Sequence, residues 1–489
     1  MCSQGLSRFI VIITFIIVIV SGTVLAQGDN GVLIVSPDGP YVTIEEALAD
    51  ATEGDMIEVH GGVYGTPLTI SVPGVSLIGI GNPAIDGQGE GSLVIIDAPD
   101  VVFRGFTVRN TGHSLMHEDT GIVIQATGVL VEDNLLEEVL FGIYLANADY
   151  SIARNNIVRG VDLDDAMRGD GIRVWYSNFA VLDGNEVTIS RDTLIWFAND
   201  ITIENNSFID NRYGLHFMYS DDALVQRNTF QGNSVGTYLM HSYGLTLIEN
   251  IMSYNRGPSG YGLALKDMDD VIVTDNLFVG NRAGMYFDNS PSEIDTFNVF
   301  TGNVLVNNDI GLIIQPSVKN NIFHSNSFMS NLQQVGTRGN GTLQGNIWDQ
   351  DGIGNYWSDY AGYDAEDDGI GDTNYRYDKL FDNIIDNYPS LRLFTFSPAA
   401  QAVNFTAMAF PSFRPEPKLV DDAPMINYVL PEFLITDDGS NQLSLPLLSV
   451  SLLLVGLSVV IFVFALSLPV PFGRTEQSKR HVSSSVTEV

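Results

Sequence analysis

The 489-residue sequence is poor in cysteine and in basic residues. Its one cysteine, Cys2, lies near the N-terminus, and 23 Lys and Arg stand against 59 Asp and Glu, a formal net charge of −36 at pH 7. A nucleic-acid partner is excluded, because neutralising phosphates requires clustered Lys and Arg. The single cysteine also excludes a disulfide framework and a cluster of thiolate ligands.

Long hydrophobic runs occur only near the two ends. Arg8 precedes an apolar run of 12 residues, Phe9–Val20, and the small residues Val24 and Ala26 follow at signal-peptidase spacing. We therefore predict a signal peptide over residues 1–26 and export of the remainder, with an uncleaved membrane anchor as the alternative. Cleavage would leave an exported chain without a thiol.

The second run, Leu445–Leu468, has 24 predominantly apolar residues and no charge, which is long enough to cross a bilayer. Basic residues follow this run and are absent from the segment before it, so the positive-inside rule places the tail, residues 471–489, in the cytoplasm. We predict a transmembrane helix over residues 445–470 that tethers an exported body to the cell membrane by a single pass. A buried core helix is the alternative.

Between these ends helical periodicity is scarce and internal repetition takes its place. An apolar-x-x-Asn-x-apolar unit recurs every 20 to 29 residues. Its asparagines are Asn134, Asn156, Asn185, Asn206, Asn228, Asn250, Asn276, Asn303, Asn326 and Asn346. A Gly-apolar-x-apolar unit alternates with it. Its glycines are Gly121, Gly142, Gly171, Gly214, Gly236, Gly262, Gly284 and Gly311.

Two short alternating segments per period, separated by Asn, Asp and Gly turns, predict an all-β fold. We expect a right-handed parallel β-helix, or solenoid, over residues 27–350, in which each turn of about 22 residues adds one rung. The repeated asparagines should stack as an internal ladder. The segment Thr43-Ile-Glu-Glu46 has a capping-box pattern, so an N-terminal helix should cover the first rung.

The C-terminal part of the body is divided by composition. Residues 351–395 are rich in Gly, Asp and aromatics and are predicted to cap the coil, with Trp348, Tyr356 and Trp357 plugging the last rung. Residues 396–444 are predicted to be a Pro-rich linker to the membrane segment.

An acidic loop in this cap, Asp364–Asp372, resembles a calcium loop because it spaces carboxylates before a glycine. Tyr375 stands where the closing Glu of such a loop would be. Calcium binding is therefore the alternative to a plain glycine-rich cap.

Strand periodicity assigns faces to the glycine-started rungs. Positions +1 and +3 after each glycine point into the coil, and positions +2 and +4 point out. The rung Asp192–Phe197 lacks the glycine and is predicted to place Ile195 and Phe197 outward. A surface rich in aromatics, methionine and histidine is unusual if it faces only water. The other predicted outward residues are Tyr144, Ala146, Arg173, Trp175, His216, Met218, Tyr238, Met240, Ala264, Lys266, Tyr286 and Asp288.

Two successive rungs of this face combine histidine and methionine. His216 and Met218 lie two residues apart, roughly 7 Å, and Met240 is expected to stack over Met218 at the strand spacing of roughly 4.8 Å. Imidazole and thioether ligands together suit Cu(I). We predict a Cu(I) site formed by His216, Met218, Met240 and His241, the last of which can reach it only from the turn. The alternative is a hydrophobic docking strip.

Four segments and the Arg191-Asp192 step resemble the NosD family of exported nitrous oxide reductase maturation factors, and the likeness extends over about residues 30 to 395. The segments are Gly169-Asp-Gly-Ile-Arg-Val-Trp-Tyr-Ser177, Tyr213-Gly-Leu-His-Phe-Met-Tyr219, Gly354-Asn-Tyr-Trp-Ser-Asp-Tyr360 and Asp367-Asp-Gly-Ile-Gly-Asp372. Single rungs are common to many β-helix proteins, but the His-Phe-Met-Tyr rung together with the aromatic closing segment is not.

The resemblance implies an accessory protein of denitrification rather than an enzyme. It implies a place outside the membrane on an ABC transporter made of a membrane subunit and an ATPase. It also implies a copper chaperone lipoprotein as donor and nitrous oxide reductase as the acceptor whose copper centres are assembled. Copper, as transient Cu(I), or sulfur would be the cargo. The appended linker and membrane helix depart from the family pattern.

Two other function classes remain open on the residues alone. A β-helix polysaccharide lyase or epimerase needs catalytic carboxylates or a basic and tyrosine cluster in a cleft. The candidate carboxylates are predicted to lie in turns, where Asp is an ordinary residue; they are Asp162, Asp164, Asp165, Asp170, Asp221 and Asp222. A structural surface coil shares the repeats but gives no reason for the histidine and methionine rungs.

Overall fold

The computed structural model describes residues 31–65, 67–339 and 341–435. The predicted signal peptide, transmembrane helix and C-terminal tail lie outside these residues. Within them, no helix combines the length and apolar character needed to span a membrane.

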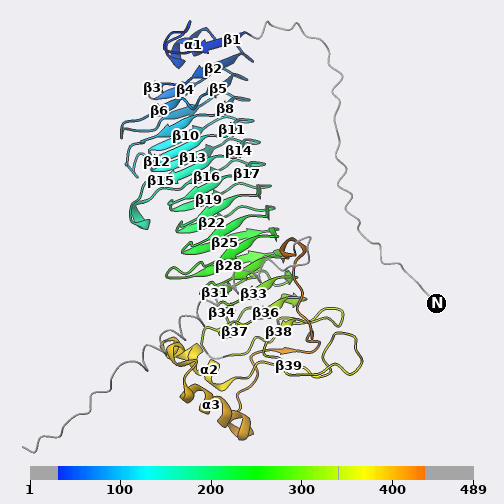
Figure 1. The fold of residues 1–489 in the computed structure, drawn as a ribbon. Coiled ribbons are helices and arrows are strands. Elements are labelled where there is room, and N and C mark those ends of the chain that lie inside the picture. Colours follow the sequence, from blue (N-terminus) through cyan, green and yellow to red (C-terminus); the bar gives the residue numbers. More distant parts are fainter. Residues whose placement is uncertain (1–30, 66, 340, 436–489) are drawn as a thin grey trace, which may run out of the picture.

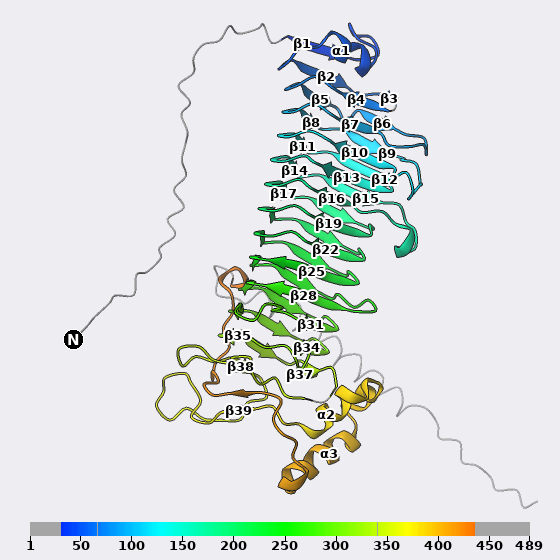
Figure 2. The ribbon, with the colours of Figure 1, turned by 180° about the vertical axis from the view of Figure 1, so that it is seen from behind.

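The body is a long coil of stacked rungs, seen from two opposite sides in Figures 1 and 2. Three parallel sheets with 13, 13 and 12 strands form its walls, and each strand pairs with the equivalent strand one turn earlier and one turn later. The predicted parallel β-helix is confirmed. We call the three walls sheets A, B and C.

Sheet A consists of short strands, most of them three residues long. They are β1 (Val32–Val35), β2 (Met56–His60), β5 (Ser76–Ile80), β8 (Val102–Arg104), β11 (Leu130–Glu132), β14 (Ile152–Arg154), β17 (Val181–Asp183), β20 (Thr202–Glu204), β23 (Leu224–Gln226), β26 (Thr246–Ile248), β29 (Ile272–Thr274), β32 (Asn298–Thr301) and β35 (Asn321–His324).

Sheet B follows sheet A in every turn. Its strands are β3 (Val63–Tyr64), β6 (Ala84–Asp86), β9 (Thr107–Arg109), β12 (Leu135–Val139), β15 (Ile157–Gly160), β18 (Glu186–Thr188), β21 (Ser207–Ile209), β24 (Thr229–Gln231), β27 (Ile251–Ser253), β30 (Leu277–Val279), β33 (Val304–Val306), β36 (Ser327–Met329) and β38 (Tyr356–Trp357).

Sheet C contains the glycine-started rungs and has the longest strands. They are β4 (Leu68–Ile70), β7 (Val94–Ile96), β10 (Thr120–Ile124), β13 (Phe141–Ala146), β16 (Ile172–Trp175), β19 (Asp192–Trp196), β22 (Tyr213–Met218), β25 (Val235–Tyr243), β28 (Tyr261–Asp269), β31 (Ala283–Asp288), β34 (Ile310–Ile314) and β37 (Gln333–Thr337).

The predicted asparagine ladder is present inside the coil. Asn228, for example, donates from Nδ2 to Asn250 Oδ1 over 3.0 Å, and its backbone N–H donates to the same oxygen over 2.9 Å. Each ladder asparagine directly precedes a strand of sheet B. The ladder therefore ends on Asn355, which precedes β38 and accepts from Asn326. The prediction that Asn346 is the last asparagine of this ladder was wrong, because Asn346 belongs to a separate column with Asn298 and Asn321.

Both predicted ends of the coil are recognisable. Helix α1 (Ile44–Asp50) begins with the predicted capping box of Thr43 and Glu46 and contacts β1, β2 and β4. At the other end, Trp357 stacks on Phe328 with ring centres 4.3 Å apart, so the predicted aromatic plug is confirmed for this residue. Trp348 stacks on Phe323, whereas Tyr356 is only half-buried.

The segment predicted as a linker, residues 396–444, is described as far as Ile435 and contains folded elements. Ser397 caps an alanine-rich helix, α3 (Pro398–Ala409), which packs on α2 (Leu380–Asn387). The remaining elements of this region are η2 (Pro389–Phe394), η3 (Pro411–Phe413), η4 (Glu432–Leu434) and the antiparallel pair β39 (Tyr375–Arg376) and β40 (Val420–Asp421). An exposed turn earlier in the chain holds η1 (Asp165–Met167).

Candidate functional site

The outer face of sheet C carries the predicted histidine and methionine rungs. Register pairs His216 with Tyr238 and Met218 with Met240, so β22 and β25 align these side chains as the sequence predicted. The intervening residues of β22, Leu215 and Phe217, are fully buried in the coil. The glycine-based assignment of faces is thus confirmed for these two rungs.

The faces predicted for the preceding rung, Asp192–Phe197, were wrong. Ile195 was predicted to point outward, yet it pairs with Val174 and lies fully buried in the core. Leu194 and Trp196 point outward instead. The pairing of β19 with β22 shifts register after Asp192, and a one-residue shift exchanges the two faces of a strand. Phe197, also predicted outward on this face, lies at the corner after β19.

The ring of His216 is held by a contact at Nδ1 and by two neighbouring tyrosine rings. Its Nδ1 lies 3.1 Å from Asp192 Oδ2, and its ring packs edge-on against Tyr213 and nearly parallel to Tyr238. The side chain is only 11% exposed. The second nitrogen, Nε2, is buried and finds no hydrogen-bond partner in the described part of the chain.

Asp192 determines which nitrogen of His216 carries the proton. Burial alone would raise the pKa of Asp192, but hydrogen bonds from His216 and Arg212 outweigh burial and lower the pKa below its ordinary value. An ionised carboxylate only accepts hydrogen bonds, so Nδ1 is the donor. The neutral imidazole then presents the lone pair of Nε2, which is how a carboxylate commonly orients a metal-binding histidine.

The two methionines occupy the next outward column of sheet C. Met218 lies between Trp196 of the preceding rung and Met240 of the following rung, and both methionines are half-buried. The described residues contain no group of three His, Cys, Asp or Glu side chains that could hold a metal ion. A metal site on these rungs would therefore rest on one imidazole nitrogen and methionine sulfur, a donor set that suits Cu(I) and is poor for hard cations.

His241, the fourth predicted ligand, lies at the corner of the coil where β25 bends. Its backbone has a left-handed φ of 54°, its ring stacks on Tyr219 at 5.0 Å, and its Nδ1 lies 3.3 Å from Asp267 Oδ2. The same corner carries a stack of aromatic rings in successive turns, made by Tyr176, Phe197 and Tyr219. These contacts orient His241 toward the corner stack rather than toward His216.

An acidic cleft of about 920 Å³ adjoins this corner. His241 and Ser242 are among its lining residues, together with six carboxylates and several uncharged side chains. Those carboxylates are Asp221, Asp267, Asp269, Asp270, Glu293 and Asp295. Such a lining attracts cations to the neighbourhood of Met240.

The sequence interpretation missed a buried charge network beside the site. Asp170 was predicted to be a turn residue, but its side chain is fully buried and accepts from Arg173 and Arg191. The side chain of Asp192 is also buried, and its carboxylate contacts Arg212 and His216. The only sequence signal is an Asp at the start of two successive rungs. Arginine side chains engage both carboxylates, and burial raises the pKa of Asp170 despite its two arginine partners.

The remaining predicted carboxylates behave as loop residues. Asp162 and Asp165 lie near Arg168 in an exposed turn. In the acidic loop of the cap, Asp364 accepts from the backbone N–H groups of Asp367 and Gly369, and these bonds lower its pKa. Because this carboxylate is occupied by its own loop, the geometry gives no support to the calcium prediction.

Comparison with known proteins places the chain in a family. Residues 159–362 match the family model described as periplasmic copper-binding protein (NosD), and residues 69–241 match a family of unknown function. The probable ABC transporter binding protein NosD of Pseudomonas aeruginosa is 30% identical over 391 residues, covering 70% of this chain and 81% of the relative.

A second relative with the same description, from Stutzerimonas stutzeri, is 28% identical over 391 residues and covers 70% of this chain and 80% of its own length. Both relatives are named as binding proteins and not as enzymes. Among solved structures, the mannuronan C-5 epimerase A-module of Azotobacter vinelandii aligns with 62% of this chain and 93% of its own, at 15% identity and a TM-score of 0.49. The extent and identity of the match to the Pseudomonas protein show that this chain belongs to the NosD family.

Proposed function

We propose that this protein is an exported copper-handling component of an ABC transporter system that assembles the copper centres of nitrous oxide reductase. The observation that carries the proposal is that β22 and β25 place His216, whose Nε2 has no hydrogen-bond partner among the described residues, and the register-paired Met218 and Met240 on one outer face of sheet C. The family description as a periplasmic copper-binding protein and the naming of both relatives as ABC transporter binding proteins support it.

The donor set suits a transient cargo better than a permanent cofactor. The thioethers carry no charge, and the neutral form of His216 with its proton on Nδ1 would bind Cu(I) through Nε2 without losing that proton. A copper chaperone lipoprotein would deliver Cu(I), the transporter's membrane subunit and ATPase would drive the exchange, and the reductase would receive it. Sulfur needed for the same centre is the alternative cargo.

An anaerobic Cu(I) competition titration tests this function. The full chain would carry Cys2→Ser, so that no thiol competes, and would be compared with a variant that also carries His216→Ala, Met218→Ala and Met240→Ala. We expect one Cu(I) per chain and loss of that binding in the variant, with unchanged circular dichroism in both. Absence of stoichiometric binding in the Cys2→Ser chain would refute the copper proposal and favour sulfur transfer or a docking role.

A further inference from the structure

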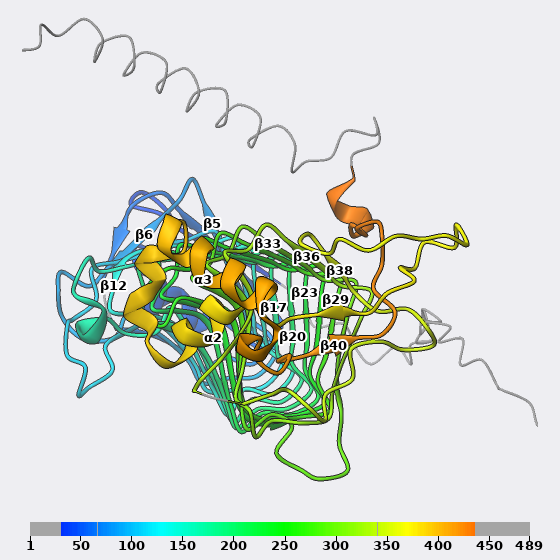
Figure 3. The same ribbon diagram turned by 90° about the horizontal axis from the view of Figure 1, so that it is seen from below.

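The C-terminal end of the coil exposes a surface unlike the rest of the molecule. Helices α2 and α3 lie across this end, as the view from below shows (Figure 3). Large apolar side chains of η2, α3, η3 and the residues that join them have exposed fractions between 60% and 90%. We call these residues the terminal apolar surface; they are Leu393, Phe396, Phe405, Met408, Phe410 and Phe413.

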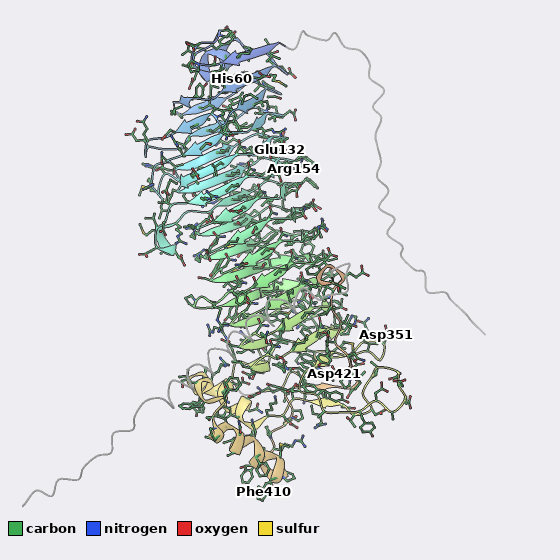
Figure 4. The ribbon with its side chains drawn as sticks, in the orientation of Figure 1. His60, Glu132, Arg154, Asp351, Phe410 and Asp421 are labelled. Atoms are coloured by element: carbon green, nitrogen blue, oxygen red, sulfur yellow. The ribbon has the colours of Figure 1, made fainter. Side chains whose placement is uncertain are left out.

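This exposure follows from how α3 packs. The helix turns Ala400 and Val403 toward α2, where they join Phe381 and Ile385 in a small separate core. Phe405 and Met408 stand on the opposite side and are 69% and 81% exposed. Phe410 lies at the lower tip of the molecule in Figure 4.

The segment that carries this surface has no acidic residue, although the chain as a whole is strongly acidic. Residues 387–415 contain no Asp or Glu, although the whole chain has 59. Its two basic residues, Arg392 and Arg414, are bonded to Gln333 and Asp378. The strongly acidic body is repelled by an anionic surface, whereas this end is not.

The described part of the chain ends on the outer face of sheet B, a few rungs before the C-terminal end of the coil. After β40, the chain runs back along the outer face of sheet B, where Leu430, Phe433 and Leu434 pack against Leu277 and Val304. The described residues end at Ile435, and the 24-residue apolar run begins at Leu445. The nine intervening residues reach at most about 35 Å. Because β30 and β33 are the tenth and eleventh of the 13 strands of sheet B, a membrane held by that run lies nearer to the end that carries the terminal apolar surface than to the N-terminal end of the coil.

We propose that the terminal apolar surface inserts into the interfacial region of the membrane and fixes the C-terminal end of the coil against it. Phenylalanine, leucine and methionine side chains on a neutral helical end have the chemistry of a shallow lipid anchor. Contact at this end in addition to the predicted membrane segment holds the coil upright rather than free to swing. The inference goes beyond copper handling and does not depend on it.

Site-specific labelling of the full chain tests this. A Cys2→Ser chain has no thiol, so Phe405→Cys and Met408→Cys can each be labelled with one environment-sensitive fluorophore and reconstituted in phosphatidylcholine–phosphatidylglycerol vesicles. The matched control is Ile294→Cys, because Ile294 is an apolar residue that is 88% exposed between Glu293 and Asp295, in the loop between β31 and β32 on the side of the coil. We expect brominated lipids to quench the labels at 405 and 408 by at least about twofold more than the label at 294.

A second variant separates the surface from the tether. Phe405→Glu with Phe413→Glu should leave vesicle flotation intact while the label at 408 loses its quenching. Equal quenching at 408 and 294 in the unmutated surface would overturn the proposal. So would protection of the label at 408 that arises only when the transporter's membrane subunit is added, since the occupant would then be a protein.

Discussion

The two faces of sheet C follow different rules although their residues alternate along the same strands. Inside the coil, each rung buries side chains at the same positions as its neighbour: Leu215 and Phe217 are succeeded by Thr237 and Leu239, all fully buried. Outside, the residues change from rung to rung, from Trp196 to Met218 to Met240 to Lys266. The repeated inner positions form the β-helix, whereas the outer residues that differ from rung to rung place histidine and methionine on two rungs only within the described part of sheet C.

The largest effect on the free energy of unfolding is expected from a change in the asparagine ladder inside the coil. Asn228→Ala removes the side chain that accepts from the Asn206 backbone and donates to Ile203 and Asn250. Buried backbone groups lose their partners, so we expect thermal unfolding followed by circular dichroism to show a loss of about 3 kcal/mol. A loss no greater than that of the outer-face change Met240→Leu would contradict the division of roles.

Changes to the outer face should lower Cu(I) affinity and leave the free energy of unfolding nearly unchanged. Met218→Leu combined with Met240→Leu conserves volume, so stability should change by less than about 1.5 kcal/mol. Removal of both thioethers should lower Cu(I) affinity at least about tenfold in a competition titration, because leucine offers no soft donor. Met252→Leu, which alters a methionine buried inside the coil, is the control and should leave affinity unchanged. Equal affinities in all three proteins would remove the methionines from the site.

A sharper test separates binding from positioning on the same face. Asp192→Asn keeps the shape of the side chain that contacts His216 Nδ1 but loses its charge. We expect Cu(I) affinity to fall about 10- to 100-fold, as for other residues that orient a metal-binding histidine. Nitrogen NMR of the histidine ring should show that the proton no longer resides on Nδ1 alone. Asp183→Asn, which alters an ion pair on sheet A, is the control, and an unchanged ring spectrum in Asp192→Asn would refute the positioning role.

The smallest effect is expected at the corner of the coil. His241 is occupied by its stack with Tyr219 and its contact with Asp267, so His241→Ala should change Cu(I) affinity less than about twofold. The same titration measures it. A loss as large as that caused by Met240→Leu would show that His241 turns toward the site when copper binds.

The sequence predicted the inside of the coil better than the outside for a physical reason. Periodic glycines and asparagines recur because every turn must satisfy the same buried backbone groups, and this repetition is visible in a linear string. Asn346 was assigned to the wrong column because a loop intervenes before β38. Ile195 was assigned to the wrong face because no residue pattern in the sequence signals the register shift after Asp192. The contact between Asp192 and His216 spans 24 residues and one turn, so it emerges only when the rungs are stacked.

X-ray absorption spectroscopy of the Cu(I)-loaded Cys2→Ser chain tests the central claim most directly. The structure predicts a first coordination shell with one imidazole nitrogen and two thioether sulfurs, and loss of the sulfur scattering in the variant with Met218→Leu and Met240→Leu. A shell of nitrogen and oxygen alone, or sulfur scattering that persists in that variant, would place copper elsewhere and contradict the assignment of these rungs as the cargo site.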